Sequence, residues 1–463
     1  MTIDATGLTL STPTETAAAA LRAVQHAYLC YRRDLPQRLG ELLQADPAFG
    51  FAHTVKALML LGGFRASDAP VIRAALLQAR DGHRAATERE RLHWQAAVQW
   101  HAGDPLGATR VFEVILARWP HDLLAYRLHH FVSFWLGRPE NMLQMAERLQ
   151  TTWQPEWPFY GSLLACRAFA NEEAGNHTLA ENLGRRSVEL DPGDPWGAHA
   201  VAHVLEMQGR REEGIQWVDS LQEHWHDRNN LAHHLWWHQG LYCYELGDFN
   251  RVLALYDQRF RNLASPLTAA LPDLYIDVQN AVSMLFRLQL QQVDVGDRWT
   301  ELADLAEQRT GDCESLFTVP HWAMALVATG RDAAVARLIG GIEAYGQADP
   351  AAAAIAAGLT PAAAATPGHP AQAMDYVLPL CRAVVHHGRG EYRQACDLIR
   401  PIIGDLFKLG GSHAQQDLLE QLYVDAAIRG DQQADQALLL SRAQGRGRLA
   451  PSRRRGWAGL AAR

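Results

Sequence analysis

Apolar residues recur with a helical period through most of the chain, and glycines interrupt this pattern at regular intervals. Each of these glycines follows one apolar stretch and precedes another, which predicts two helices joined by a short turn. The turn glycines are Gly63, Gly103, Gly137, Gly175, Gly209, Gly247, Gly296, Gly330, Gly390 and Gly430. Gly103 to Gly247 follow one another at 34 or 38 residues, and Gly296 and Gly330 are again 34 apart. A helix–turn–helix unit of 34 residues is typical of tetratricopeptide arrays.

The segment 161–194 shows why these positions suit a helical hairpin. Its first helix ends at Gly175, and its second carries Ala180 and Ser187, small residues that let a neighbouring helix approach closely. Pro192 marks the end of the second helix, because a proline cannot continue it. Since one hairpin cannot bury its own apolar face, neighbouring hairpins must stack. The sequence therefore predicts an all-α fold, a superhelical solenoid of about eight to ten tetratricopeptide-like hairpins.

The expected organisation is one continuous repeat domain over residues 16–440, after a flexible N-terminus at 1–15. Two stretches break the period. Residues 258–272 lengthen one connection, and residues 347–370 are rich in alanine and proline, as in a surface loop with a short helix. An arginine-rich tail follows at 441–463 and is expected to be solvated.

The net charge and the cysteines indicate which partners and which cellular compartment to expect. The chain has 43 basic and 51 acidic side chains, and seven of the basic ones lie in the tail. The remaining body is strongly acidic, which argues against a nucleic-acid partner. The six cysteines are scattered without a CxxC motif, as expected for reduced, buried thiols. With no signal-peptide pattern and no run of about 18 apolar residues, the chain is expected to be cytoplasmic and not to bind membranes.

Four segments carry a more specific resemblance. They are DPWGAHAVAHVLEMQGR at 194–210, NNLAHHLWWHQGLYCYELGDF at 229–249, VPHWAMAL at 319–326 and GGSHAQQD at 410–417. Over about residues 15–440 the chain resembles the tetratricopeptide repeat protein 38 family. The resemblance implies a soluble right-handed superhelix of repeats and no particular activity. Relatives tend to close with a further helix that has a tryptophan near its start, and here only Trp457 matches that feature.

The first helix of each tetratricopeptide hairpin lines the inner face, so its register identifies candidate ligand contacts. With the turn glycine at position 15, positions 2, 5, 9, 12 and 13 point inward. We expect an inner groove lined by residues at these positions, by two histidines at position 6 and by the histidine of the Gly-Gly-Ser-His segment. The lining residues are His93, Trp100, His101, Arg127, Glu172, His199, His203, Glu206, His234, Trp237, His238, Glu245, His321, His387 and His413. Histidine, tryptophan and glutamate thus recur on one face of successive helices.

A divalent metal site, for example for zinc, is one interpretation of this pattern. His199 and His203 are four residues apart on one predicted helix, and Glu206, His234 or His238 can supply a third ligand. The pattern is not H-E-x-x-H, because Ala-Val-Ala separates the two histidines. The structural alternative is that these histidines only hydrogen-bond to carboxylates and backbone in a tightly wound groove.

Acid–base chemistry without a metal is a second interpretation. The candidates for it are His199, His203, Glu206, His234, His238, Asp277, His321, His413 and Asp417. Neither a G-x-S-x-G nor a P-loop motif is present. The leading prediction is therefore a binding protein that holds a protein segment or a small molecule in its inner groove. An enzyme, most simply a hydrolase, that uses the same histidines is the alternative. Because the groove carries histidine and glutamate instead of lysine, and Arg127 is its clearest cation, we do not expect a chaperone-type clamp for a peptide carboxylate.

Overall fold

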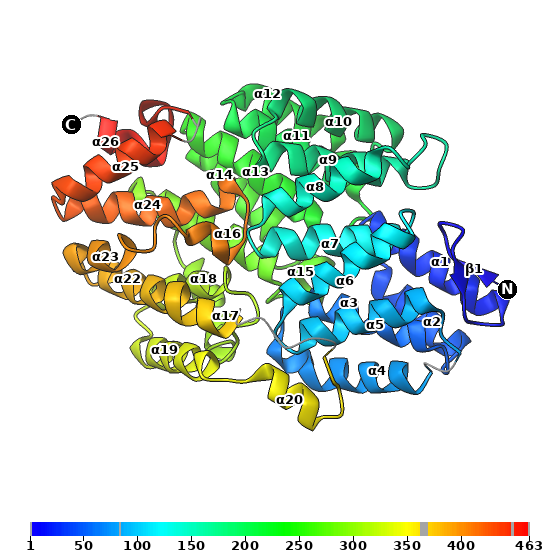
Figure 1. Cartoon of the computed structure of the whole chain (residues 1–463). Coiled ribbons are helices and arrows are strands. Elements are labelled where there is room, and N and C mark those ends of the chain that lie inside the picture. The colour runs from blue at the N-terminus through cyan, green and yellow to red at the C-terminus, as the bar shows by residue number, and fades with distance from the viewer. Residues whose placement is uncertain (1, 83–84, 362–368, 446–448, 462–463) are drawn as a thin grey trace. The chain divides into compact units, whose positions relative to one another are not determined.

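The computed structural model describes residues 2–82, 85–361, 369–445 and 449–461, and in these residues almost all regular structure is helical (Figure 1). One small sheet lies at the N-terminus, where β1 (Thr2–Ile3) pairs antiparallel with β2 (Thr9–Leu10). Contacts divide the chain into two compact units. Unit 1 consists of residues 1–200, 224–229 and 348–370, and unit 2 of residues 201–223, 230–347 and 371–463. The expectation of one continuous domain over 16–440 stays a prediction.

Unit 1 is built from successive pairs of contacting helices. They are α1 (Glu15–Leu29) with α2 (Leu35–Ala45), α3 (Gly50–Leu61) with α4 (Ala69–Asp81), α5 (Glu88–His101) with α6 (Pro105–Arg118), α7 (Leu123–Trp135) with α8 (Pro139–Gln150), and α9 (Tyr160–Glu173) with α10 (His177–Leu190). A 3-10 turn, η1 (Ala66–Asp68), precedes α4, and α11 (Pro195–Met207) begins in unit 1 and ends in unit 2.

Unit 2 continues the same arrangement. Its first part contains α12 (Arg211–Leu221), α13 (Leu231–Leu246), α14 (Phe249–Leu255), the π-helix η3 (Tyr256–Phe260), α15 (Pro266–Ala270), α16 (Tyr275–Leu290), α17 (Trp299–Gln308), α18 (Val319–Ala328) and α19 (Asp332–Gly346). The 3-10 turn η2 (Gln222–Trp225) begins in unit 2 and ends in unit 1. Its second part contains the π-helix η4 (Ala373–Val377), α22 (Leu378–Gly388), α23 (Tyr392–Ile399), η5 (Leu406–Leu409), α24 (His413–Arg429), α25 (Gln433–Gly445), η6 (Pro451–Arg453), η7 (Arg455–Trp457) and α26 (Ala458–Ala461). The short helix α21 (His369–Gln372) begins in unit 1 and ends in unit 2.

The predicted turn glycines explain how consecutive helices reverse direction. Eight of the ten have φ between 60° and 84°, the left-handed region that glycine enters without steric cost. At the other two turns the left-handed residue comes one position later, at Phe64 (φ 51°) and Asp431 (φ 52°). The prediction of an all-α fold of stacked hairpins is confirmed.

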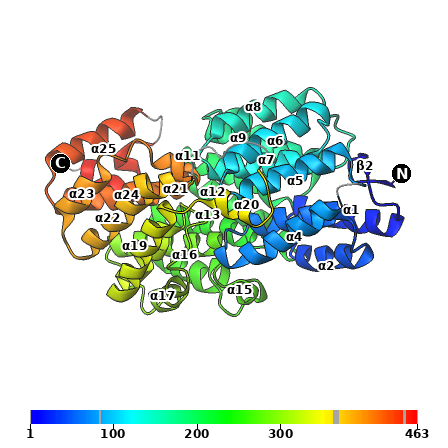
Figure 2. The same ribbon diagram turned by 60° about the horizontal axis from the view of Figure 1, so that its bottom comes forward.

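The Ala/Pro-rich insertion packs on unit 1 in its described part. It contains α20 (Pro350–Ala356), which lies beside α4 and α5 (Figure 2). Arg80 on α4 donates a hydrogen bond to the carbonyl oxygen of Gly358 at 2.9 Å, and Leu359 is fully buried. Residues 362–368 of the insertion lie outside the described residues.

Both ends of the chain have buried side chains among the described residues. Near the N-terminus, Asp4 is buried and forms an ion pair with Arg89 at 3.1 Å. In the C-terminal tail, Trp457 and Leu460 are buried, at 1% and 2% exposed, instead of solvated. The tail differs from the expectation because these two apolar side chains give it a face that packs against α24. Arg446, Arg448 and Arg463 lie outside the described residues.

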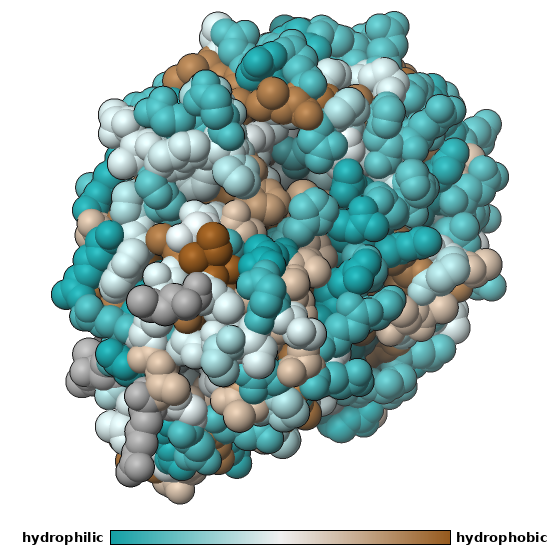
Figure 3. Space-filling model, turned by 90° about the vertical axis from the view of Figure 1, so that its right-hand side faces the viewer, coloured by the Kyte–Doolittle hydropathy of each residue, from teal (hydrophilic) through white to brown (hydrophobic). Residues whose placement is uncertain are grey.

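The surface and the cysteines agree with helices that bury their apolar faces against one another. The face shown in Figure 3 is mostly hydrophilic, and its apolar residues form small separate patches. All six cysteines are free thiols, and five of them are buried, as predicted. Among the described residues, every helix is too short or too polar to cross a bilayer.

Candidate functional site

Three of the predicted histidines converge inside unit 2, and we call His203, His234 and His238 the imidazole cluster. His203 comes from α11, while His234 and His238 lie one turn apart on the same face of α13. The ring centroid of His238 is 4.5 Å from that of His203 and 4.9 Å from that of His234. All three side chains are at most 2% exposed. One ring nitrogen of each lies within 4.8 Å of those of the other two.

Burial keeps the imidazole cluster neutral. Desolvation lowers the pKa of His234 and of His238 to about 3, and it also lowers the pKa of His203 far below its usual value. His234 Nδ1 lies 2.7 Å from the Asn280 amide oxygen, which can only accept, so Nδ1 carries the proton. His238 Nδ1 lies 2.8 Å from Glu206 Oε2. When a hydrogen bond holds Nδ1 of a neutral imidazole in this way, it fixes the orientation of the ring, and Nε2 is the nitrogen that can serve as a metal ligand.

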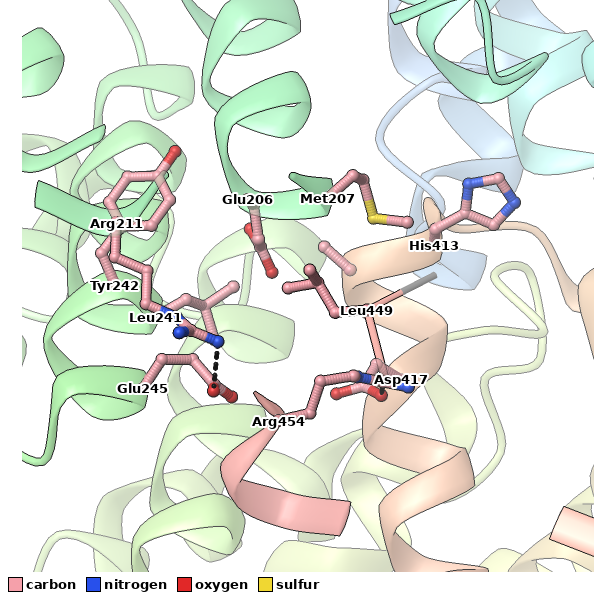
Figure 4. A pocket seen from close by; sticks show the side chains of 11 residues that line it. Glu206, Met207, Arg211, Leu241, Tyr242, Glu245, His413, Asp417, Leu449 and Arg454 are labelled. Carbon is pink, nitrogen blue, oxygen red and sulfur yellow. Dashed lines mark hydrogen bonds and ion pairs between the residues drawn. The ribbon is translucent and has the colours of Figure 1, made fainter. Parts of the chain in front are cut away.

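Glu206 links the imidazole cluster to a cavity. It lies in the last turn of α11, one turn beyond His203. Desolvation raises the pKa of its carboxyl to about 7, although Arg287, Arg454 and Arg211 act in the opposite direction. Its side chain keeps 21% of its surface accessible, and the carboxyl faces the cavity (Figure 4).

The cavity of unit 2 has a volume of about 60 Å³, enough for a few water molecules. Its walls come from α11, α12, α13, α24 and the C-terminal tail (Figure 4). They are formed by Glu206, Met207, Arg211, Leu241, Tyr242, Glu245, His413, Ala414, Asp417, Leu449 and Arg454. Four of the predicted residues thus line one space, namely Glu206, Glu245, His413 and Asp417.

Arginines face the carboxylates of this cavity. Arg211 donates to Glu245 at 3.0 Å, and Arg454 pairs with Asp417. Asp417 is also 3.6 Å from Arg287, which is 1% exposed. Burial lowers the pKa of Arg454 to about 10 and lowers that of Arg287 as well. The cavity therefore presents cations and carboxylates in a partly desolvated setting.

His413 reaches the cavity because a helix begins beside it. Ser412 is the N-cap of α24: its hydroxyl accepts from the backbone N–H of Gln415 at 3.3 Å, and the Gln415 side chain accepts from the Ser412 N–H at 3.0 Å. Gly410 and Gly411 both have positive φ just before this cap. The Gly-Gly-Ser-His segment thus starts a helix and also places an imidazole at the cavity.

The other predicted residues of unit 2 make polar contacts and are not among the residues that line the cavity. Asp277 accepts from Asn230 at 2.6 Å and lies 3.0 Å from His233 Nδ1. Trp237 donates to the hydroxyl of Ser283 at 3.0 Å. His321 Nδ1 donates to the carbonyl of Phe317 at 2.9 Å, and His387 is 2.7 Å from Asp425.

The predicted residues of unit 1 have different surroundings. His93 pairs with Asp122 at 2.8 Å in a fully buried network that also includes Arg89. Trp100 packs against Phe64 and Phe131. Burial and the nearby Arg73 lower the pKa of His101, and Glu172 is 1% exposed on α9.

His199 precedes His203 by one helical turn, and its ring packs against aromatic side chains of unit 1. It stacks on Trp196, with 4.8 Å between the centroids, and on Phe169, with 5.1 Å. Arg127 also packs in unit 1, where its guanidinium lies 4.5 Å from the Trp196 ring.

Sequence reasoning did not find several residues of the unit 2 site. Asn280 and Arg287 lie on α16, the first helix of the hairpin with Gly296, and no residue of that helix was assigned to the inner face; Asp277 was named only as an acid–base candidate. Applying the same register there identifies Arg287 at position 6. Leu449 and Arg454 come from outside the repeats, where the repeat register gives no signal.

Stacked hairpins with turn glycines of positive φ place the chain in the class of tetratricopeptide-like helical-repeat proteins. No protein-family model matches the chain. A search of solved structures finds similarity to a structure described as Naa15/Naa10 bound to HypK-THB, at 12% identity and a TM-score of 0.24, over 92% of this chain and 68% of that chain.

Proposed function

We propose that the chain is a ligand-binding helical-repeat protein of the tetratricopeptide repeat protein 38 family and that unit 2 holds its ligand centre. In this centre the imidazole cluster binds a divalent transition-metal ion such as zinc, and the adjoining cavity binds a small polar molecule. One observation carries the proposal: three buried, neutral imidazoles converge, and two of them are oriented by Glu206 and Asn280.

The donor set supports zinc in particular. Three imidazole nitrogens and one open position make a common catalytic zinc site, with bonds of about 2.0–2.1 Å. Nitrogens within 4.8 Å of one another reach such bonds after shifts of about 1 Å in the rings. Metal ligands must be deprotonated, and burial already holds the histidines in that state.

The cavity lining supports a polar molecule of few atoms. Three carboxyl groups, two guanidinium groups and one imidazole line about 60 Å³. Fixed charges of both signs in so small a space select a ligand by the sign and the position of its own polar groups. A second candidate ligand is a protein segment that binds along the inner faces of the first helices. The proposed compartment for either ligand is the cytoplasm.

An enzyme, most simply a hydrolase, is the alternative function. The observation that favours it is the Glu206 carboxyl, which is hydrogen-bonded to His238 and faces the cavity. A carboxyl in that place can accept or donate a proton at an atom of a bound molecule. A bound zinc ion supplies Lewis-acid chemistry. Arg454 and Arg211 can orient an anionic group of the same molecule.

Elemental mass spectrometry of the purified protein, after dialysis against zinc and then against metal-free buffer, tests the metal centre. We expect about one zinc per chain, and a loss of about tenfold or more in affinity in His203→Ala and in His234→Ala. His321→Ala is the matched control, because His321 is equally buried in unit 2 but hydrogen-bonds to Phe317. A wild-type chain that retains no zinc, or variants that retain as much as the wild type, would remove the metal from the proposal.

A further inference from the structure

Arg127, on α7 in unit 1, is a buried cation without an ionic partner among the described residues. Its side chain is 6% exposed. Its hydrogen bond goes from a guanidinium N–H to the thiol sulfur of Cys166 at 3.2 Å. Burial raises the pKa of that thiol, so the sulfur is neutral and a weak acceptor. Buried arginines are seldom found without an anion, because desolvation of the charge is costly unless it is paired.

Two aromatic rings flank the guanidinium and reach the surface. Its central carbon lies 4.8 Å from the Tyr31 ring and 4.5 Å from the Trp196 ring. The two rings are nearly parallel, with 6.0 Å between their centroids and 22° between their planes, and both side chains are partly exposed. Cation–π contacts of this kind orient the guanidinium but do not neutralise its charge.

Within the part of the chain that the structure describes, further polar groups at the same place also lack protein partners. His130, one turn from Arg127 on α7, is 1% exposed, and neither of its ring nitrogens has a hydrogen-bond partner among the described residues. Its ring meets Trp196 edge to face at 5.7 Å, and the Trp196 indole N–H and the Tyr31 hydroxyl are likewise buried without partners. Unsatisfied donors around an unpaired cation are typical of a site completed by a ligand.

We propose that Arg127, Tyr31, Trp196 and His130 form a binding site for a small organic carboxylate in unit 1. A planar carboxylate matches the guanidinium fork, and the flanking rings provide a stacking surface for a flat apolar group. The small exposed fraction of Arg127 favours a small molecule over a chain terminus. The site goes beyond the unit 2 centre and does not depend on it.

Ligand-detected NMR with benzoate tests the site, and benzamide serves as the uncharged probe of the same shape. At constant ionic strength we expect benzoate to bind with a dissociation constant on the order of millimolar, and benzamide to bind about tenfold or more weakly. Arg127→Met should weaken benzoate binding by about tenfold or more, because the charge-assisted hydrogen bonds are lost. Arg186→Met, at an exposed arginine of the same unit, is the matched control and should bind as the wild type does.

The inference fails if benzoate and benzamide bind alike, or if Arg127→Met binds benzoate as tightly as the wild type does. Inorganic phosphate is the third probe: if it displaces benzoate at equal concentration, the site selects oxyanions in general and the carboxylate assignment is wrong. Thermal unfolding of the ligand-free variants checks the fold. If Arg127→Met does not fold, Arg127→Lys keeps the charge without the fork, and undiminished benzoate binding by that variant would overturn the proposal.

Discussion

Gly214 lies so close to Tyr242 that a Cβ atom added to it would be 2.4 Å from the tyrosine ring. Tyr242 is fixed in turn, because its hydroxyl donates to the carbonyl of Ala202 at 2.6 Å. The ring packs with Val201 and Leu205, so it cannot move aside easily. This contact holds α12 against α13, and α13 carries two histidines of the imidazole cluster.

We therefore expect Gly214→Ala to destabilise the protein by about 1–3 kcal/mol through overpacking. The matched control is Gly340→Ala in α19, where nothing lies within 4 Å of the added Cβ. That substitution should be neutral or stabilising by about 0.5–1 kcal/mol, because alanine favours a helix. Urea unfolding measures both free energies, and equal effects at the two sites would contradict the packing argument.

Acid should destabilise the protein partly through His321. Burial lowers its pKa to about 3 in the folded chain, whereas an unfolded histidine titrates near 6.5. Between these two values the unfolded state binds one more proton, so this contribution to stability is present above pH 6.5 and is lost as the pH falls toward 3. In His321→Gln the dependence of the unfolding free energy on pH should be shallower by up to about 1.4 kcal/mol per pH unit. Urea titrations of the wild type and of His321→Gln from pH 4.5 to 7.5 measure this dependence. Parallel curves of unfolding free energy against pH would refute the prediction.

The C-terminal tail should detach when its anchor is removed. Trp457 is 1% exposed, donates to Asp417 at 3.0 Å and lies under the Arg454 guanidinium, 4.4 Å from it. Trp457→Ala removes this packing, so we expect trypsin to cleave after Arg453, Arg454 or Arg455 about tenfold faster or more. Phe407→Ala, at a 42% exposed phenylalanine of the same unit, is the control. An unchanged cleavage rate in Trp457→Ala would show that the segment is held by other contacts.

Asp431 is expected to be a site of mild backbone strain. Its φ of 52° lies in the left-handed region, which costs a residue with a Cβ about 1 kcal/mol. Asp431→Gly should raise the unfolding free energy by a few tenths to about 1 kcal/mol, and Asp431→Ala should lower it by a similar amount. Thermal unfolding of the two variants tests the sign, and the same sign for both would refute the strain.

The fold was predictable because each hairpin repeats one local pattern. A glycine at the turn, small residues on the second helix and apolar residues at helical spacing are all local signals, and Gly103 to Gly247 carry them clearly. The turns at Phe64 and Asp431 were placed one residue early, because a glycine beside a turn looks the same in sequence as a glycine within it.

The site was predictable only where the repeat register applied. The register placed His203, Glu206, His234 and His238 on facing surfaces, and these three histidines and the glutamate do lie close together. It could not show that His93 is fixed by Asp122, because that contact joins different hairpins. It also gave no signal for Arg454, whose place depends on a segment beyond the repeats.

That segment has a consequence for affinity. Leu449 and Arg454 occupy part of the wall of the unit 2 cavity, and they are tethered to the same chain. A tethered group competes with a free ligand at an effective concentration of about millimolar or higher. Any ligand that needs the space of these side chains must first shift the docking equilibrium, so its apparent dissociation constant rises by the factor by which the docked state is favoured. Changes at Trp457, which is not among the residues lining the cavity, would then tune how tightly unit 2 holds its ligand.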